Sequence, residues 1–241
     1  MMKASQDRTA VNDLDVIPIE ALDLRLEPFD WPFAAARRAE IDAHFDALRR
    51  RLPHVWNGRI LLVRDWAVDD GTLRARLFET DYASFMAWRD WGWPDTGVTN
   101  AFAMGALRGR DGGFLLGEMA SGTANQGKIY FPCGTPDPSD ARDGIVDFAG
   151  SIAREMQEET GIGSEAYTAG PWALVPAGRL LAVIRRLEAR VPAAALCETA
   201  RAHIAAEADP ELARVVAVHG PADLGPGVLD FVRAYLLHAW A

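Results

Sequence analysis

Three glutamates and an arginine crowd the segment from Arg154 to Ile162, which reads REMQEETGI. At 3.6 residues per turn, Glu155, Glu158 and Glu159 fall on one face of a helix, because they sit three and four positions apart. Like charges at these spacings repel one another, and the last turn of a helix disfavours anions. A bound cation would offset that repulsion, and carboxylates without sulfur or imidazole beside them suit a hard ion, Mg²⁺ first and Mn²⁺ second. The segment therefore predicts a metal site on a helix.

The residues around these glutamates predict how the helix is held. Gly161 is expected to end the helix as a left-handed cap. The stripe opposite the glutamates, which we expect to face the core, consists of Ile145, Ala149, Ile152, Ala153 and Met156. A solvated surface helix with surplus glutamate would give the same short pattern, so the pattern alone does not decide. A strand-like segment, a Pro-Cys-Gly turn and the Gly161 cap all stand where a metal site needs them, which favours the chemical interpretation.

The order R-E-U-x-E-E-x-G-U, in which U is a bulky apolar residue, resembles the second half of the Nudix box. Phe131-Pro132-Cys133-Gly134 resembles the turn that opens this box. Gly134 lies 20 residues before Arg154, which is about six more than the family pattern, so residues within TPDPSDARDG look inserted. The family's first glutamate, a structural partner of the box arginine, would fall at Val146. Asp147, two helical turns before Arg154, could substitute for it.

The resemblance covers about Val98 to the C-terminus and implies an α/β fold, a Nudix-like α/β/α sandwich with a mixed sheet. Alternating apolar patterns and turn residues ahead of it predict a small N-terminal α/β unit, so we expect two parts, residues 1–95 and 96–241. The predicted strands include a hairpin around Asp69-Asp70-Gly71 and the segments Asn100 to Arg108, Gly113 to Ala120, Tyr167 to Val175, Arg179 to Leu187 and Leu212 to Val218.

The activity that the resemblance implies is a metal-dependent pyrophosphohydrolase acting on nucleoside diphosphates linked to another moiety. Glu155, Glu158 and Glu159 would hold Mg²⁺ against the diphosphate, with the carbonyl of Gly134 as a further ligand. The metal would neutralise the leaving phosphate and lower the pKa of an attacking water. Arg154 would orient the glutamates and hold the loop before the helix. The general base stays open between a box glutamate and a loop carboxylate such as Glu165.

A second resemblance covers the front of the chain. Trp56-Asn57-Gly58 before a strand, a tryptophan-rich segment ending in Thr99-Asn100 and the elongated box are similar to eukaryotic Nudix UDP-glucose diphosphatases. It implies a nucleotide sugar rather than a free nucleotide. Trp91 and Trp93 could then stack on a base and Lys128 could face the diphosphate, although tryptophans also pack seams between units and a lone lysine is by default a surface charge.

A different class of protein stays open, a Nudix-fold module that binds or senses a nucleotide derivative without hydrolysing it. Val146 in place of the first glutamate and the stretched loop motivate this alternative. The intact Glu155, Glu158 and Glu159 speak against it, because a pure binding site has no need to maintain their repulsion.

Composition and net charge restrict the classes of partner that the chain is expected to bind. The 241 residues are 49% hydrophobic and 24% charged, with a net charge of −9, which argues against general binding of nucleic acid or anionic membranes. Cys133 and Cys197 are too few for a disulfide framework, so a reducing cytoplasm fits best. The N-terminal sequence MMKASQDRTAVNDLD contains no apolar export segment, and no apolar run is long enough to span a membrane. The expected partner is a small molecule, and a homodimer stays open.

Overall fold

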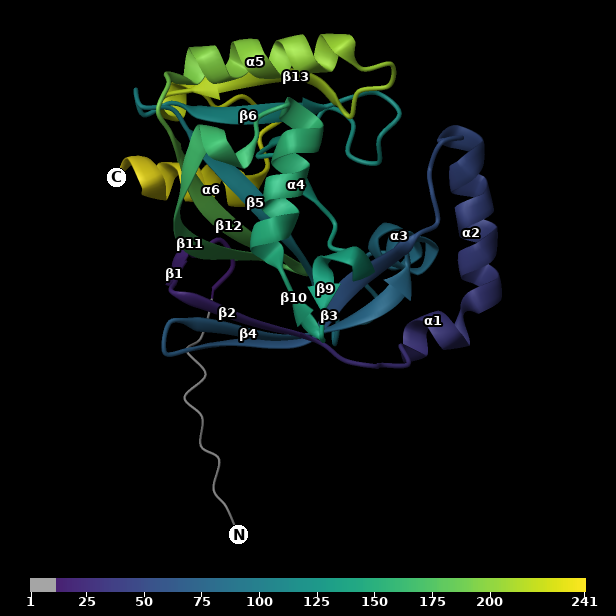
Figure 1. The fold of residues 1–241 in the computed structure, drawn as a ribbon. Coiled ribbons are helices and arrows are strands. Elements are labelled where there is room, and N and C mark those ends of the chain that lie inside the picture. The colour runs from purple at the N-terminus through teal and green to yellow at the C-terminus, as the bar shows by residue number, and fades with distance from the viewer. Residues whose placement is uncertain (1–11) are drawn as a thin grey trace.

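The computed structural model describes residues 12–241 (Figure 1). Residues 1–11 lie outside the described residues, and they include most of the N-terminal sequence in which no export segment is expected.

The larger of two sheets is mixed and has eight strands, in the order β1-β11-β12-β5-β6-β13, with β7 paired to β6 and β8 to β5. Only the pairing of β12 with β5 is parallel among the described strands of this sheet. Its strands are β1 (Ile17–Ile19), β5 (Asn100–Arg108), β6 (Phe114–Met119), β7 (Ile129–Tyr130), β8 (Cys133–Gly134), β11 (Tyr167–Ala177), β12 (Leu180–Ala189) and β13 (Leu212–Val218).

The second sheet has five strands in the order β3-β4-β2-β10-β9 and is also mixed, because β2 and β4 run parallel. Its strands are β2 (Ala21–Leu26), β3 (Arg59–Asp69), β4 (Thr72–Asp81), β9 (Ala141–Arg142) and β10 (Ile145–Val146). The predicted turn joins β3 to β4, and Asp70 and Gly71 both have positive φ, 47° and 69°, as a two-residue hairpin turn requires.

The helices are α1 (Pro32–Ala36), α2 (Arg38–Arg51), α3 (Tyr82–Asp90), α4 (Phe148–Thr160), α5 (Ala193–Ala206) and α6 (Asp230–Trp240). Figure 1 shows α4 in front of the strands of the larger sheet and α6 behind them, with α5 along β13 and β6. A sheet covered by helices on both faces buries both sets of its side chains. The predicted α/β class with a mixed sheet is confirmed.

Strand pairing connects the first part of the chain to the rest. β1 pairs with β11 in the larger sheet, and β2 pairs with β10 in the smaller one. One hydrophobic core joins residues of both sheets, among them Leu24, Leu77, Met104, Val183 and Leu187. A second core, which includes Trp31, Phe45, Phe78 and Trp88, belongs to residues before 99. The boundary expected near residue 95 stays a prediction, and pairing crosses it at both sheets.

Candidate active site

Helix α4 carries the predicted glutamates, and its two ends are fixed by caps. The side chain of Asp147 accepts hydrogen bonds from the backbone of Ala149 and Gly150, each at 3.0 Å, which satisfies two donors of the first turn. Gly161 ends the helix with a φ of 68°, a conformation that glycine adopts without a Cβ clash.

The buried face of α4 rests on β5 through a close approach at Gly105. A Cβ on Gly105 would lie 2.8 Å from Met156 Cε and 3.0 Å from Ile152 Cγ2, so only glycine lets the helix pack this tightly. Phe148 is also fully buried. The expectation that Ile145 belongs to this stripe was wrong, since it pairs with β2 on β10 and is 50% exposed.

Arg154, in the middle of α4, contacts three carboxylates. Its Nη1 lies 2.6 Å from Glu155 Oε1 and 3.5 Å from Glu158 Oε2, and its Nη2 lies 2.9 Å from Asp140 Oδ1. The expectation that Asp147 would be the arginine's structural partner was wrong, because Asp147 caps the helix and Asp140 takes that position. Asp140 lies in the inserted segment, and its side chain is 4% exposed.

The inserted segment is an ordered structure that presents Asp140 to the helix. It forms a short 3₁₀ turn, Pro138–Asp140, followed by the β9–β10 hairpin, whose turn residues Asp143 and Gly144 have φ of 50° and 75°. The second carboxylate oxygen of Asp140 accepts from the backbone N–H of Asp137 at 3.0 Å. Val146, where the family pattern has its first glutamate, is buried in the core.

The three glutamates of α4 differ in burial. Glu155 and Glu159 are buried at 9% and 4% exposure, whereas the side chain of Glu158 is 60% exposed. Burial raises the pKa of Glu155 to about 7. Burial, reinforced by the charges of Glu211 and Glu155, raises the pKa of Glu159 well above its usual range. Without a cation, Glu155 and Glu159 therefore keep their protons to a higher pH than a solvated glutamate does.

Glu159 holds one oxygen in place and leaves the other without a partner. Its Oε1 accepts from the backbone N–H of Cys133 at 3.3 Å. Its Oε2 is buried and has no hydrogen-bond partner among the described residues. Burial raises the pKa of the Cys133 thiol, with Glu159 and Glu155 adding to the effect, so this thiol is a poor nucleophile.

Glu211, the residue directly before β13, is a fourth acidic residue that sequence reasoning missed. Partial burial raises the pKa of its carboxyl, and Glu158 and Glu207 add to this. Its charge acts on Glu159 and Glu155 of α4, and the pairing of β13 with β6 determines its position. Its position between a helix and a predicted strand was the only local signal.

The donor chemistry of this cluster fits a hard divalent cation. It offers carboxylate oxygens, one of them buried without a partner, and Gly134 packs so closely that a Cβ there would lie 2.1 Å from Glu155 Oε1. Among the described residues, no three acidic, histidine or cysteine side chains converge into a ready-made metal site. Arg154 instead lies between two of the glutamates, with its Nη1 2.6 Å from Glu155 Oε1 and 3.5 Å from Glu158 Oε2.

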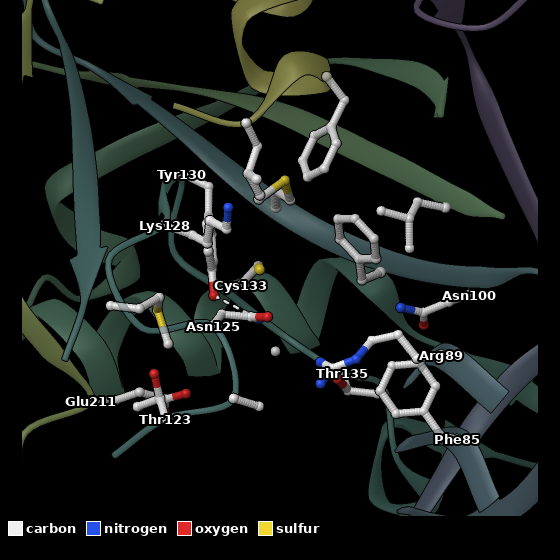
Figure 2. Close-up of a pocket in the computed structure, with 18 of the residues that line it drawn as sticks. Phe85, Arg89, Asn100, Thr123, Asn125, Lys128, Tyr130, Cys133, Thr135 and Glu211 are labelled. Carbon is white, nitrogen blue, oxygen red and sulfur yellow. Dashed lines mark hydrogen bonds between the residues drawn. The ribbon is translucent and has the colours of Figure 1, made fainter. Parts of the chain in front are cut away.

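A cavity of about 310 Å³ opens beside the cluster, a size within the usual range for small-molecule sites. β5 and β6 pair only at Arg108 and Phe114 and diverge beyond that point; β8 pairs with β5 and β7 with β6. Residues of all four strands line the cavity. Figure 2 shows Glu211 and Thr123 on one side of it and Asn100, Arg89 and Phe85 on the other. The lining residues before residue 95 are Tyr82, Phe85, Arg89 and Trp93.

The predicted substrate residues occupy different places. Trp93, Lys128 and Gly134 line the cavity. Trp91 instead packs outside it, with the guanidinium of Arg37 4.3 Å from its ring centre. Glu165 lies in the turn Ser164–Ala166 beyond the end of α4. Lys128 and Arg89 also border a second cavity of about 520 Å³, which reaches α2.

No family model matches the sequence, and no curated protein matches it. Solved structures give partial likenesses. A Nudix hydrolase from M. smegmatis, RenU, is 18% identical over 57% of this chain and 80% of its own, with a TM-score of 0.37. The MutT protein from Methanosarcina mazei Go1 is 16% identical over 58% and 92%, with a TM-score of 0.36. A C. elegans Ap4A hydrolase is 15% identical over 59% and 95%, with a TM-score of 0.35. At these identities and TM-scores the likenesses carry no conclusion on activity.

Within residues 12–241, no helix combines the length and apolar character needed to cross a membrane.

Proposed function

We propose that this chain is a divalent-cation-dependent pyrophosphohydrolase of the Nudix type. Its expected substrate is a nucleoside diphosphate linked to a second moiety, with a nucleotide sugar as the class that the front of the chain favours. One observation carries the proposal. The buried Glu159 Oε2 has no partner among the described residues and belongs to a cluster of carboxylates beside a cavity of small-molecule size.

The roles follow from what each residue contacts. Glu155, Glu158 and Glu159 would hold the cation, with Mg²⁺ preferred over Mn²⁺ and the Gly134 carbonyl as a further ligand. A cation bound there would supply positive charge against the negative charge of the leaving phosphate. Arg154 keeps Glu155 oriented and ties it to the inserted segment through Asp140. Water would add to one phosphorus as the P–O–P bridge breaks, releasing two phosphomonoesters.

The cavity supports a substrate with two moieties. Arg89 and Lys128 border both cavities, so two cations stand where the two spaces meet. Lys128 is the cation that a diphosphate would contact, because Arg89 lies with Asn100 on the side of the cavity opposite Glu211 (Figure 2) and pairs with Asp90 at 3.0 Å. The nucleoside would occupy the smaller cavity, and the second moiety would extend toward α2. Residues 1–95 would then select the substrate, because α3 and Trp93 supply one wall.

The alternative, a module that binds a nucleotide derivative without cleaving it, loses one of its motives. That motive is the missing first glutamate, the expected structural partner of Arg154. Asp140 supplies Arg154 with a buried carboxylate partner in its place. Only activity separates the two functions.

The deciding experiment uses the full chain with a panel of nucleotide sugars and dinucleotides. Product phosphomonoesters would be measured after treatment with a phosphatase, with Mg²⁺, with Mn²⁺ and with a chelator. We expect cation-dependent release from at least one nucleotide sugar. Saturable binding of panel members without release under any cation condition would favour the binding module instead.

A further inference from the structure

Asn100 places a buried amide oxygen, without a partner among the described residues, on the wall of the smaller cavity. It is the first residue of β5, and its backbone N–H donates to the carbonyl of Arg179 at 2.8 Å. The residue is 7% exposed. Its Oδ1 is buried and accepts no hydrogen bond from residues 12–241.

Such an acceptor is unusual, because folding removes its hydrogen bonds to water and no protein donor replaces them. A conformational reason is lacking as well, since the backbone of Asn100 is ordinary paired strand, in register with Leu180 on β12. An apolar side chain of the same shape would suit the strand better. The amide is therefore explained best by a ligand that donates a hydrogen bond to it.

The surroundings of Asn100 define the shape of that ligand. Phe102 and Met104 follow it at alternate positions of β5 and line the same cavity, and the ring of Phe102 lies 5.5 Å from that of Phe231 on α6. Phe85 of α3 and Trp93 complete an aromatic enclosure. Flat aromatic surfaces favour a flat ring, and a carboxamide offers an acceptor and a donor in one plane.

We propose that Asn100 recognises the edge of a nucleobase, accepting a hydrogen bond from a ring or exocyclic N–H. This inference rests on the proposed function, which places the diphosphate at the carboxylate cluster. The orientation is consistent with the charges of the cavity. Figure 2 shows the acidic Glu211 and the amide of Asn100 on opposite sides, so the base and the diphosphate would have separate ends.

The first test needs no variant. Binding of UDP, ADP, GDP and CDP to the full chain would be measured by calorimetry, followed by a methylated counterpart of the tightest ligand. In that counterpart methyl groups replace every N–H hydrogen of the base edge, including both hydrogens of an exocyclic amine. We expect at least one nucleoside diphosphate to bind and methylation to weaken it about tenfold or more, because a buried acceptor then stays unpaired. Equal binding of the methylated and unmethylated ligands, or binding of none of the four, would overturn the inference.

The second test is Asn100→Leu, which keeps a branched side chain and removes the amide. We expect the dissociation constant to rise about tenfold and the preference for the unmethylated ligand to disappear. The ligand-free variant should melt at the wild-type temperature or above it, since an unsatisfied polar group has been removed. A lower melting temperature with unchanged affinity and selectivity would mean that Asn100 is structural.

A matched variant is Asn125→Leu. Asn125 lines the same cavity, but its Nδ2 already donates to Tyr130 Oη at 3.1 Å. We expect Asn125→Leu to keep the preference for the unmethylated ligand. An equal loss of this preference in both variants would assign the effect to the polarity of the cavity and overturn the role of Asn100. These tests use equilibrium binding, so failure of hydrolysis alone would overturn the proposed function and leave this inference standing.

Discussion

Asp140 Oδ1 lies 2.9 Å from Arg154 Nη2, which means that a carboxylate from the inserted segment holds the arginine of the acidic helix. Asp140 is almost fully buried, and Arg154 is about one third exposed at 35%. The same Asp140 side chain accepts from the backbone of Asp137. One residue therefore closes the inserted segment on itself and fastens it to α4.

Asp140→Ala should lower the free energy of unfolding by about 2 kcal/mol, because it leaves the Arg154 side chain and the Asp137 N–H without their acceptor. Chemical denaturation would measure this. A double-mutant cycle with Arg154→Ala should show coupling, whereas Asp147→Ala should cost about 1 kcal/mol as a lost helix cap and be additive with Arg154→Ala. Coupling of Asp147 rather than Asp140 to Arg154 would contradict the assignment.

The stability of the metal-free protein should fall as pH rises from about 4.5 to about 7. Burial raises the pKa of Glu155 from 4.5 to about 7, so in this window the folded state binds more protons than the unfolded one. The contribution is fully present below pH 4.5 and is lost above 7, on the order of 3 kcal/mol. Unfolding in chelator across this range would measure it.

Glu155→Gln should make this slope shallower without abolishing it, since burial also raises the pKa of Glu159 and of Glu211. A slope that stays the same in Glu155→Gln would show that Glu155 already ionises normally in the folded protein.

Glu158→Gln should reduce turnover on the order of a thousandfold while leaving the fold intact, if Glu158 is a cation ligand. Its side chain is 60% exposed, so its loss removes little packing. Added Mg²⁺ should raise the melting temperature of the wild type more than that of the variant. Glu198→Gln, an exposed glutamate on α5, is the matched control and should change neither property. Near-normal turnover of Glu158→Gln would make the acidic face structural.

Gly134→Ala should weaken the response to Mg²⁺, because the added Cβ would fall 2.1 Å from Glu155 Oε1 and displace that carboxylate. We expect kcat/KM to fall at least about tenfold, in line with a disturbed ligand environment. Gly220→Ala meets nothing within 4 Å and serves as the control. Wild-type turnover and an unchanged Mg²⁺ effect on melting in Gly134→Ala would exclude close packing of Gly134 on the site.

Trp93→Ala should raise KM more than it lowers kcat, the signature of lost uniform binding. Trp93 lines the cavity, while Trp91 packs on Arg37 outside it. Trp91→Ala is therefore expected to lower stability with a smaller effect on KM. Steady-state kinetics of both variants would measure this. Equal falls in kcat and kcat/KM for Trp93→Ala would mean that Trp93 acts in the chemical step rather than in substrate binding.

Local signals predicted much of the fold. The cap at Gly161, the Asp-Gly turn between β3 and β4 and the strand from Leu212 to Val218 all appear where the sequence placed them. Each depends on residues within a few positions of one another, such as glycine tolerating positive φ or a short alternating run.

Long-range contacts escaped prediction, and the site depends on them. Asp147 had suitable helical spacing from Arg154, but capping competed for its side chain, and only the folded insertion brought Asp140 into reach. Asn100 and Glu211 join the site through the separation of β5 from β6 and the pairing of β13 with β6. No spacing in the sequence encodes these positions.

The pairing of β10 with β2 makes the insertion and the front of the chain dependent on each other. The backbone N–H of Leu26 donates to the carbonyl of Gly144 at 2.9 Å, and Ile145 is in register with Arg25. A chain that kept the insertion but lost residues 1–95 would expose an unpaired strand edge, which invites aggregation. The two segments should therefore be inherited together, and a relative lacking the front of the chain should also have the shorter loop.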